Sequence, residues 1–264
     1  MSHVSTTTPG VRLVGSGEIP IIVIHGWMAG SELFEPMIPY LDQANFTYAL
    51  MDCRGYGARL NERGPFNVIQ IARDALALAD EMQWATFHLL GHSMAGMAAQ
   101  WLMSSCPERL ESVILLATVP ASGAAVSKER RALLTTALHD KDARLALIDT
   151  NVGHTRPEKW LREMLKLSLR TTRPDVLRDY MESWIGDDFA HQVHGSKVPA
   201  LVLVGELDPG ATRLTMGRTV MHWLSCAQLV ELLGVGHYPM QENPRQLVEA
   251  VEAFVLHLRD LTAA

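Results

Sequence analysis

Three side chains that lie far apart in the sequence have the types needed to attack a carbonyl carbon: Ser93, Asp208 and His237. Ser93 sits in the stretch GHSMAG, residues 91–96, between small neighbours. A serine hydroxyl is a weak nucleophile near neutral pH, so it needs a base within hydrogen-bond reach and a carboxylate that orients that base. His237 is the candidate base and Asp208 is the candidate carboxylate, with Glu206 as the alternative acid.

The elements around these residues are expected to bring them to one place. An apolar run ends at Leu90 and a helical pattern begins just after Ser93, so the serine lies between a strand and a helix, the setting of a nucleophile elbow. The candidate acid and base follow the predicted strands 200–204 and 228–232. Ligands of open α/β sheets bind at the carboxyl ends of the strands, and we expect the three side chains to meet there.

Strand and helix patterns alternate along most of the chain, which predicts an α/β fold with a mostly parallel central sheet and helices on both faces. The predicted strands are 20–24, 46–51, 86–90, 111–117, 200–204 and 228–232, and the predicted helices are 31–41, 67–83, 94–105, 212–223 and 244–259. Residues 120–194 have a helical and amphipathic pattern that is broken at Gly153, Pro157, Pro174 and Gly186. We expect them to form a cap over the carboxyl edge of a core domain made of residues 1–119 and 195–264.

Five segments, taken together and in order, resemble the α/β-hydrolase family: HGW at 25–27, DCRGYG at 52–57, the elbow, GELDP at 205–209 and GH at 236–237. The resemblance covers nearly the whole chain outside the cap. It implies that Ser93 is the nucleophile, that His237 is general base and then general acid, and that Asp208 orients it. We also expect the helical cap to be inserted after the sixth strand. The chain departs from the family at Ala95, where G-x-S-x-G has its last glycine, and at Arg59, where many relatives have serine.

Negative charge that develops on a carbonyl oxygen needs two N–H donors, and losing one donor typically costs about 2.7–4 kcal/mol of barrier. Met94 follows the nucleophile and opens a helix, so its main-chain N–H is free and the helix dipole adds to its effect. By resemblance to the family, the second donor is the main-chain N–H of Trp27.

The substrate pocket is expected to be largely apolar. Its predicted lining consists of His25, Trp27, Trp160, Met164 and Trp184, and Arg162 and Arg170 of the cap are candidates for binding a carboxylate. His191 and His194 have helical spacing but lack an obvious third ligand, so no metal site is expected.

Composition narrows the class of protein. The chain has 264 residues, of which 48% are hydrophobic, and its net charge of −6 without a basic stripe argues against nucleic-acid binding. The polar N-terminus and the lack of an apolar run of about 18 residues predict neither a signal peptide nor a membrane span. Three isolated cysteines predict a reduced, cytoplasmic protein. We expect a small-molecule substrate and no cofactor; assembly into a homo-oligomer stays open.

The leading interpretation is hydrolysis of a carboxylic ester or lactone through an acyl-enzyme. The same fold and triad leave three other enzymatic activities open: C–C bond hydrolysis of vinylogous diketones, haloperoxidase or perhydrolase activity, and cofactor-independent dioxygenation. A ligand receptor with an intact triad is the non-enzymatic alternative, because a fold does not fix a function.

Overall fold

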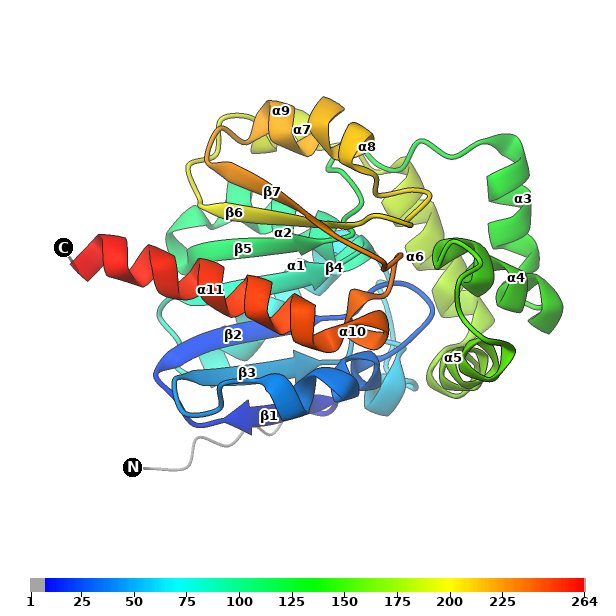
Figure 1. Ribbon diagram of the computed structural model, residues 1–264, viewed down its shortest axis with the longest axis horizontal. Coiled ribbons are helices and arrows are strands. Elements are labelled where there is room, and N and C mark those ends of the chain that lie inside the picture. Colours follow the sequence, from blue (N-terminus) through cyan, green and yellow to red (C-terminus); the bar gives the residue numbers. More distant parts are fainter. Residues whose placement is uncertain (1–7, 264) are drawn as a thin grey trace.

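Seven short apolar segments form one central sheet in the computed structural model, which describes residues 8–263. The strands are β1 (Val11–Gly15), β2 (Ile19–Ile24), β3 (Phe46–Met51), β4 (Phe87–His92), β5 (Leu110–Leu116), β6 (Ala200–Gly205) and β7 (Ala227–Leu232). Their order across the sheet is β1-β3-β2-β4-β5-β6-β7, and every neighbouring pair is parallel except β1 with β3 (Figure 1). This confirms the predicted fold class.

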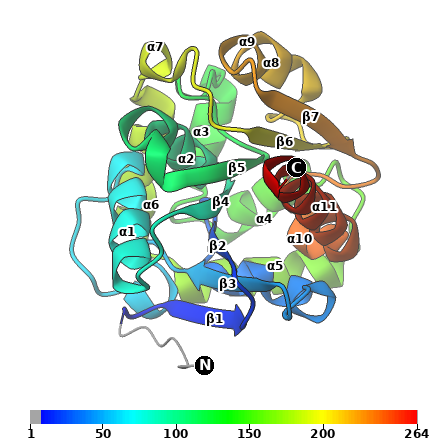
Figure 2. The same ribbon diagram turned by 90° about the vertical axis from the view of Figure 1, so that its left-hand side faces the viewer.

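Helices cover both faces of the sheet (Figure 2). Helices α1 (Val68–Glu81) and α2 (Met94–Ser105) lie on one face, and α10 (Pro239–Glu242), α11 (Pro244–Ala263) and the 3₁₀ helix η1 (Ser31–Tyr40) lie on the other. Successive strand residues point to opposite faces. Ile22 and Ile24 therefore belong to one buried cluster, whereas Ile21 and Val23 belong to the other. Burial on both faces explains why β2 is apolar without interruption.

Three elements differ from the sequence expectation. Strand β1 was not predicted, because it is a short edge strand that pairs only with β3 and has a single fully buried side chain, Val14. The predicted helix 31–41 is 3₁₀, and Pro36 and Pro39 inside it each lack the N–H that an α-helix requires. The predicted helix 212–223 is divided at Thr219 into α8 (Arg213–Arg218) and α9 (Val220–Trp223).

The helical insertion begins after β5, the fifth strand, and not after the sixth as expected. The expected strand number is too high by one. Within the described residues, five strands precede the insertion, and only one of them, β1, comes before β2. The insertion contains α3 (Lys128–Thr136), α4 (Lys141–Asn151), α5 (Glu158–Thr171), α6 (Pro174–Gly186) and α7 (Ala190–Val193). In Figure 1, α3 to α6 stand beyond the carboxyl ends of the parallel strands.

A buried arginine holds three cap helices together. Arg144 of α4 donates to the carbonyls of Ala137 and Leu138 after α3 and to the hydroxyls of Ser168 and Thr172 at the end of α5. Helix α7, by contrast, contacts α2 of the core and lies beside α9 in Figure 1. The division into a core and a cap at residues 120 and 194 stays a prediction, and α7 is the segment on which its second boundary depends.

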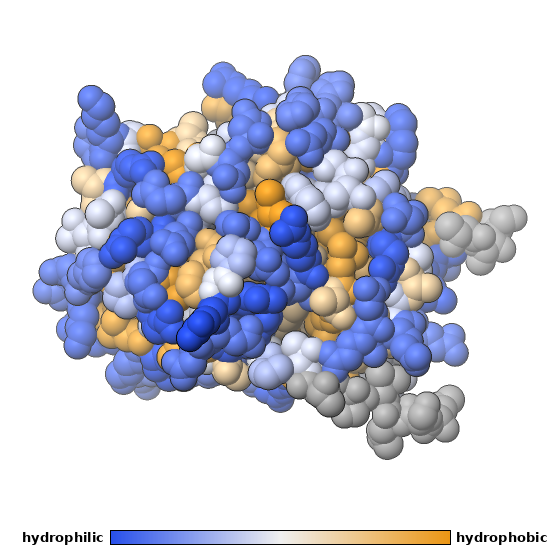
Figure 3. All heavy atoms as spheres, turned by 180° about the vertical axis from the view of Figure 1, so that it is seen from behind, coloured by the Kyte–Doolittle hydropathy of each residue, from blue (hydrophilic) through white to orange (hydrophobic). Residues whose placement is uncertain are grey.

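The face of the molecule that lies behind the view of Figure 1 is mainly hydrophilic (Figure 3). Figure 3 shows the face opposite to that of Figure 1, where smaller apolar patches lie between polar side chains. Within residues 8–263, no helix has the length and apolar character needed to cross a membrane.

Candidate active site

Ser93 occupies a sharp turn between β4 and α2. Its backbone has φ 55° and ψ −113°, a conformation that is costly for a residue with a side chain and that is typical of strained functional positions. Two glycines permit the turn. A Cβ at Gly91 would lie 2.4 Å from the carbonyl oxygen of Ala95, and a Cβ at Gly26 would lie 2.8 Å from the Cβ of Ser93. The absence of a side chain at Gly91 and Gly26 therefore lets neighbouring segments approach closely enough to form the turn that carries the Ser93 hydroxyl.

The structure brings the three sequence-predicted side chains into one hydrogen-bonded chain. Nε2 of His237 lies 3.1 Å from Oγ of Ser93, and Nδ1 of His237 lies 2.6 Å from Oδ2 of Asp208. The serine comes from the end of β4, the aspartate from the loop after β6 and the histidine from the loop after β7. All three loops leave the same edge of the sheet because these strands are parallel.

Asp208 is 4% exposed, and both oxygens of its carboxylate accept hydrogen bonds. Oδ1 accepts the main-chain N–H groups of Gly210 and Ala211 at 2.8 and 3.1 Å, which leaves Oδ2 for His237. Burial raises the pKa of Asp208. The interaction with His237 and the hydrogen bonds from these two amides together lower it by more, so the pKa lies below its ordinary value. The carboxylate is therefore ionised at neutral pH. Glu206, the alternative acid, is exposed and accepts the N–H of Gly234.

The loop that carries His237 is fixed on two sides. The main-chain N–H of His237 donates to the carbonyl of Asn151, the last residue of α4, at 2.8 Å. The buried carboxylate of Glu242 accepts the N–H groups of Gly236 and Tyr238 and forms an ion pair with Arg156 of the cap. The position of the imidazole thus depends on the cap as well as on the sheet.

The two predicted oxyanion donors are both available. Within residues 8–263, neither the Trp27 nor the Met94 main-chain N–H donates a hydrogen bond. Met94 is the first residue of α2, and Trp27 lies in the loop after β2. The Trp27 indole donates to the carbonyl of Leu177 in α6 at 2.8 Å, which fixes this loop against the cap.

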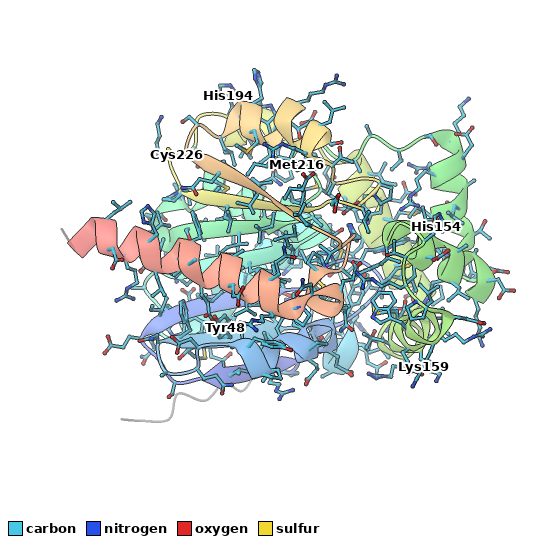
Figure 4. All side chains as sticks on the ribbon, viewed as in Figure 1. Tyr48, His154, Lys159, His194, Met216 and Cys226 are labelled. Carbon is cyan, nitrogen blue, oxygen red and sulfur yellow. The ribbon has the colours of Figure 1, made fainter. Side chains whose placement is uncertain are left out.

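A cavity of about 580 Å³ opens onto the three side chains. Ser93, Asp208 and His237 lie in its wall, and much of the remainder is apolar. The apolar lining includes Trp27, Met28, Leu134, Leu147, Trp184 and Met216, the last of which is labelled on α8 in Figure 4. Leu134 and Leu147 belong to α3 and α4, so cap helices close the space above the serine.

The sequence profile described as alpha/beta hydrolase fold matches residues 19–244, which is most of the chain and includes strands β2 to β7 as well as Ser93, Asp208 and His237. The chain belongs to the alpha/beta hydrolase fold family.

Several relatives of this α/β hydrolase are known. It is 26% identical over 251 residues to 3-oxoadipate enol-lactonase 2 of Acinetobacter baylyi, with 90% of each chain covered. It is 26% identical over 251 residues to the pimeloyl-[acyl-carrier protein] methyl ester esterase of Pectobacterium atrosepticum, covering 91% of this chain and 95% of that one. The crystal structure of the enol-lactonase from Burkholderia xenovorans LB400 superposes with a TM-score of 0.80 at 22% identity, covering 93% and 95% of the two chains.

Three of the expected pocket residues of this α/β hydrolase lie outside the cavity, and the expectation is corrected here. His25 is fully buried, accepts the N–H of Cys53 on Nε2 and contacts the carbonyl of Gly26 through Nδ1. Met164 of α5 is buried in the apolar cluster that also contains side chains of α11, and Trp160 packs against this cluster. The apolar side of an amphipathic helix can face either a core or a pocket, and here it faces the core. Trp27 and Trp184 do line the cavity.

The cationic candidates Arg162 and Arg170 are also placed elsewhere. Both are exposed and form ion pairs, with Glu158 and Glu32 respectively. The cap histidines do not gather into a metal site: within the described chain, no group of three His, Cys, Asp or Glu side chains could hold a metal ion. His154 and His194, labelled in Figure 4, lie on different parts of the fold.

The two departures from the family pattern have structural explanations. Ala95 is fully buried at the start of α2, where it packs with its carbonyl against Gly91. Arg59 is buried and forms ion pairs with Asp74 and Glu62 while donating to the carbonyl of Asp52. An arginine at this position therefore orders the turn that a serine would otherwise occupy.

His92, the residue before Ser93, is expected from its place beside the elbow to point into the fold, and it is fully buried. Its Nδ1 accepts the N–H of Gly26 at 3.1 Å, so its Nε2 carries the proton and donates to the carbonyl of His237 at 2.8 Å. Burial holds the pKa of His92 well below its ordinary value, which keeps the imidazole neutral and suited to this bridging role. One side chain thus links the loop of the expected oxyanion donor to the loop of the base.

Replacing His92 by phenylalanine should lower kcat/KM for ester hydrolysis about 5- to 150-fold, because two buried hydrogen bonds of about 0.5–1.5 kcal/mol each are lost. Steady-state kinetics measure the loss, and circular dichroism checks the fold. His139→Phe, at an exposed position of the cap, is the matched control and should retain the wild-type rate. A His92→Phe variant that unfolds at a lower temperature but keeps its full kcat would show that His92 only stabilises the fold.

Proposed function

We propose that the chain is a serine hydrolase that cleaves a carboxylic ester or lactone of a small, largely apolar substrate through an acyl-enzyme. The observation that carries the proposal is the hydrogen-bonded chain from Ser93 through His237 to Asp208 in the wall of an apolar cavity. Relatives named as an enol-lactonase and as a methyl ester esterase, each aligned over nine-tenths of this chain or more, support ester-bond chemistry.

In the first half of the proposed reaction, Oγ of Ser93 attacks the carbonyl carbon and its proton moves to Nε2 of His237. The main-chain N–H groups of Trp27 and Met94 receive the negative charge that forms on the carbonyl oxygen. When the tetrahedral intermediate collapses, the acyl–oxygen bond breaks and the leaving oxygen takes the proton from His237. Asp208 holds the imidazole in the tautomer that has its Nδ1 proton toward the carboxylate.

In the second half, a water molecule gives its proton to His237 and attacks the acyl carbon. The ester bond to Ser93 then breaks, Oγ recovers the proton and the carboxylic acid leaves. The base, the nucleophile and the oxyanion donors of this cycle are all groups of the chain itself.

The direct test is covalent labelling. An organophosphorus reagent or a sulfonyl fluoride should add one group per chain, and peptide mass spectrometry should locate it on Ser93. Turnover of p-nitrophenyl esters should fall in proportion to labelling. A label on another residue that removes activity would contradict the assignment of Ser93.

A substrate panel separates the alternatives. The proposal expects repeated turnover of p-nitrophenyl esters and of lactones. Faster loss of absorbance with vinylogous diketones, peroxide-dependent bromination that exceeds ester hydrolysis, or oxygen uptake with hydroxy-oxoquinolines would each favour another activity. Binding of several esters with no turnover of any would favour a receptor.

A further inference from the structure

One charged side chain in the wall of the cavity has no role in the proposed cycle. Arg130 belongs to α3 of the cap and lines the same cavity as Ser93. The carboxylate of Asp208, which also lies in the wall of the cavity, is already hydrogen-bonded to His237. The space is otherwise largely apolar, so a guanidinium group there is an exception that needs a physical explanation.

Arg130 is not neutralised by the protein. Its only side-chain hydrogen bond in the described chain goes from Nη2 to Oδ1 of Asn151 at 2.6 Å, and no carboxylate lies within ion-pairing distance. Burial lowers the pKa of Arg130, an effect that the more distant carboxylate of Asp208 partly opposes. A partly buried cation without a counter-ion costs free energy unless a ligand supplies the negative charge.

Its position on the helix adds to this imbalance. Arg130 lies in the first turn of α3, where Ser127 caps the helix by accepting the Arg130 main-chain N–H. The helix dipole places partial positive charge at this end, so a cation is disfavoured and an anion is favoured. Ser127 and Glu129 already serve the helix terminus, so the group left for an anionic ligand is the Arg130 guanidinium.

The neighbouring arginines show the contrast. Four of them have a carboxylate partner within the protein: Arg131 with Glu182, Arg156 with Glu242, Arg162 with Glu158, and Arg170 with Glu32. Arg144 has no such partner but donates to four oxygen atoms of the protein. Arg130, which lines the cavity, has neither a carboxylate partner nor a second hydrogen bond to the part of the chain that the structure describes.

We propose that Arg130 binds a carboxylate of the substrate, so that the enzyme acts on esters or lactones that carry a free carboxylate besides the bond to be cleaved. This inference rests on the proposed hydrolytic function and names its substrate class. Arginine suits the task because its planar guanidinium offers parallel N–H donors to both oxygens of a carboxylate. With Nη2 held by Asn151, the other N–H groups stay available to the ligand.

The test compares substrates that differ only in charge. One pair is p-nitrophenyl hemiadipate and its terminal carboxamide, which places the group on the acyl side. The second pair is the acetate esters of γ-hydroxybutyrate and of its amide, which places it on the alcohol side. In at least one pair, the wild-type kcat/KM should favour the carboxylate at least about tenfold, since an interaction with a charged group is typically worth that much.

Substitution then assigns the preference to Arg130. In Arg130→Met, the ratio of kcat/KM for the carboxylate to that for the amide should fall about 10- to 150-fold. Arg130→Lys should retain part of the preference because it retains the charge. Arg131→Met, on the same helix but paired with exposed Glu182, is the matched control and should keep the wild-type ratio.

The outcomes distinguish the inference from the function on which it rests. Equal losses on both members of a pair would show that Arg130 only supports Asn151 and the His237 loop, and would overturn the inference while hydrolysis stands. The absence of any carboxylate preference in the wild type, in either pair, would also overturn it. If no ester of either pair is hydrolysed and Ser93 takes no label, the proposed function itself fails.

Discussion

Replacing Ser93 by alanine should lower kcat for p-nitrophenyl ester hydrolysis by about three orders of magnitude or more, the size typical of losing a triad member. The substitution removes one oxygen atom and leaves His237 and Asp208 in place, so the loss measures nucleophilic catalysis and not the fold. The strained backbone at position 93 accepts alanine as readily as serine because both carry a single Cβ. Stopped-flow or extended steady-state assays can follow the residual rate.

The control for this variant is its stability and its ligand binding. Thermal unfolding and circular dichroism should match those of the wild type, and a substrate acid should still bind in the cavity. A folded Ser93→Ala variant with unchanged turnover would show that another group attacks the substrate, and the assignment of the elbow would then be wrong.

Replacing Asp208 by asparagine should lower kcat about 10⁴-fold, as it does where an asparagine stabilises the wrong tautomer of a triad histidine. The amide would donate to Nδ1 of His237, which would leave the proton on Nε2, where the base must accept one. The shape of the site would be nearly unchanged, because Oδ1 could still accept the N–H groups of Gly210 and Ala211.

Glu206→Gln provides the matched control for this second variant. Glu206 is exposed, two residues from Asp208, and accepts only the N–H of Gly234. Its amide variant should keep the wild-type kcat, as measured with the same esters. If Glu206→Gln lost activity and Asp208→Asn did not, the orienting acid would have been assigned to the wrong carboxylate.

The depressed pKa of Asp208 has a consequence for stability against pH. Because the folded-state pKa lies below the unfolded value, ionised Asp208 stabilises the fold above its ordinary pKa. That contribution is lost as pH falls through the lowered folded value. Asp208→Asn, which carries no charge, should therefore show a smaller decrease in unfolding temperature over this acidic range than the wild type.

The parts of the site that could be predicted from sequence are those fixed by short-range chemistry. A serine between a strand and a helix, with small residues at 91 and 95, can adopt few backbone conformations. Asp208 and His237 follow apolar strands, so their loops had to reach the carboxyl edge of a parallel sheet. These expectations depend on neighbours within a few positions, which the sequence displays directly.

The parts that could not be predicted depend on how helices pack. Trp160 and Trp184 are both aromatic residues on amphipathic cap helices, yet only Trp184 reaches the cavity. Arg162 and Arg130 are equally cationic in sequence, but a glutamate four residues earlier pairs with Arg162 while Arg130 has none within the described chain. The Glu158–Arg162 pair is local to α5, but whether a side chain faces the cavity, as those of Trp184 and Arg130 do, depends on contacts between helices distant in sequence. The periodicity of one helix does not specify its partner.

The hydrogen bond from the His237 main chain to Asn151 limits how far the cap could be exchanged for that of another family member to redirect specificity. The last residue of α4 belongs to the segment that a transplant would replace, yet it fixes the backbone of the general base. A graft that ends helix α4 one residue early would alter substrate selection and chemistry together. Chimeras should therefore keep position 151 and its carbonyl geometry, and take new sequence only from helices whose backbone is free of the catalytic loop.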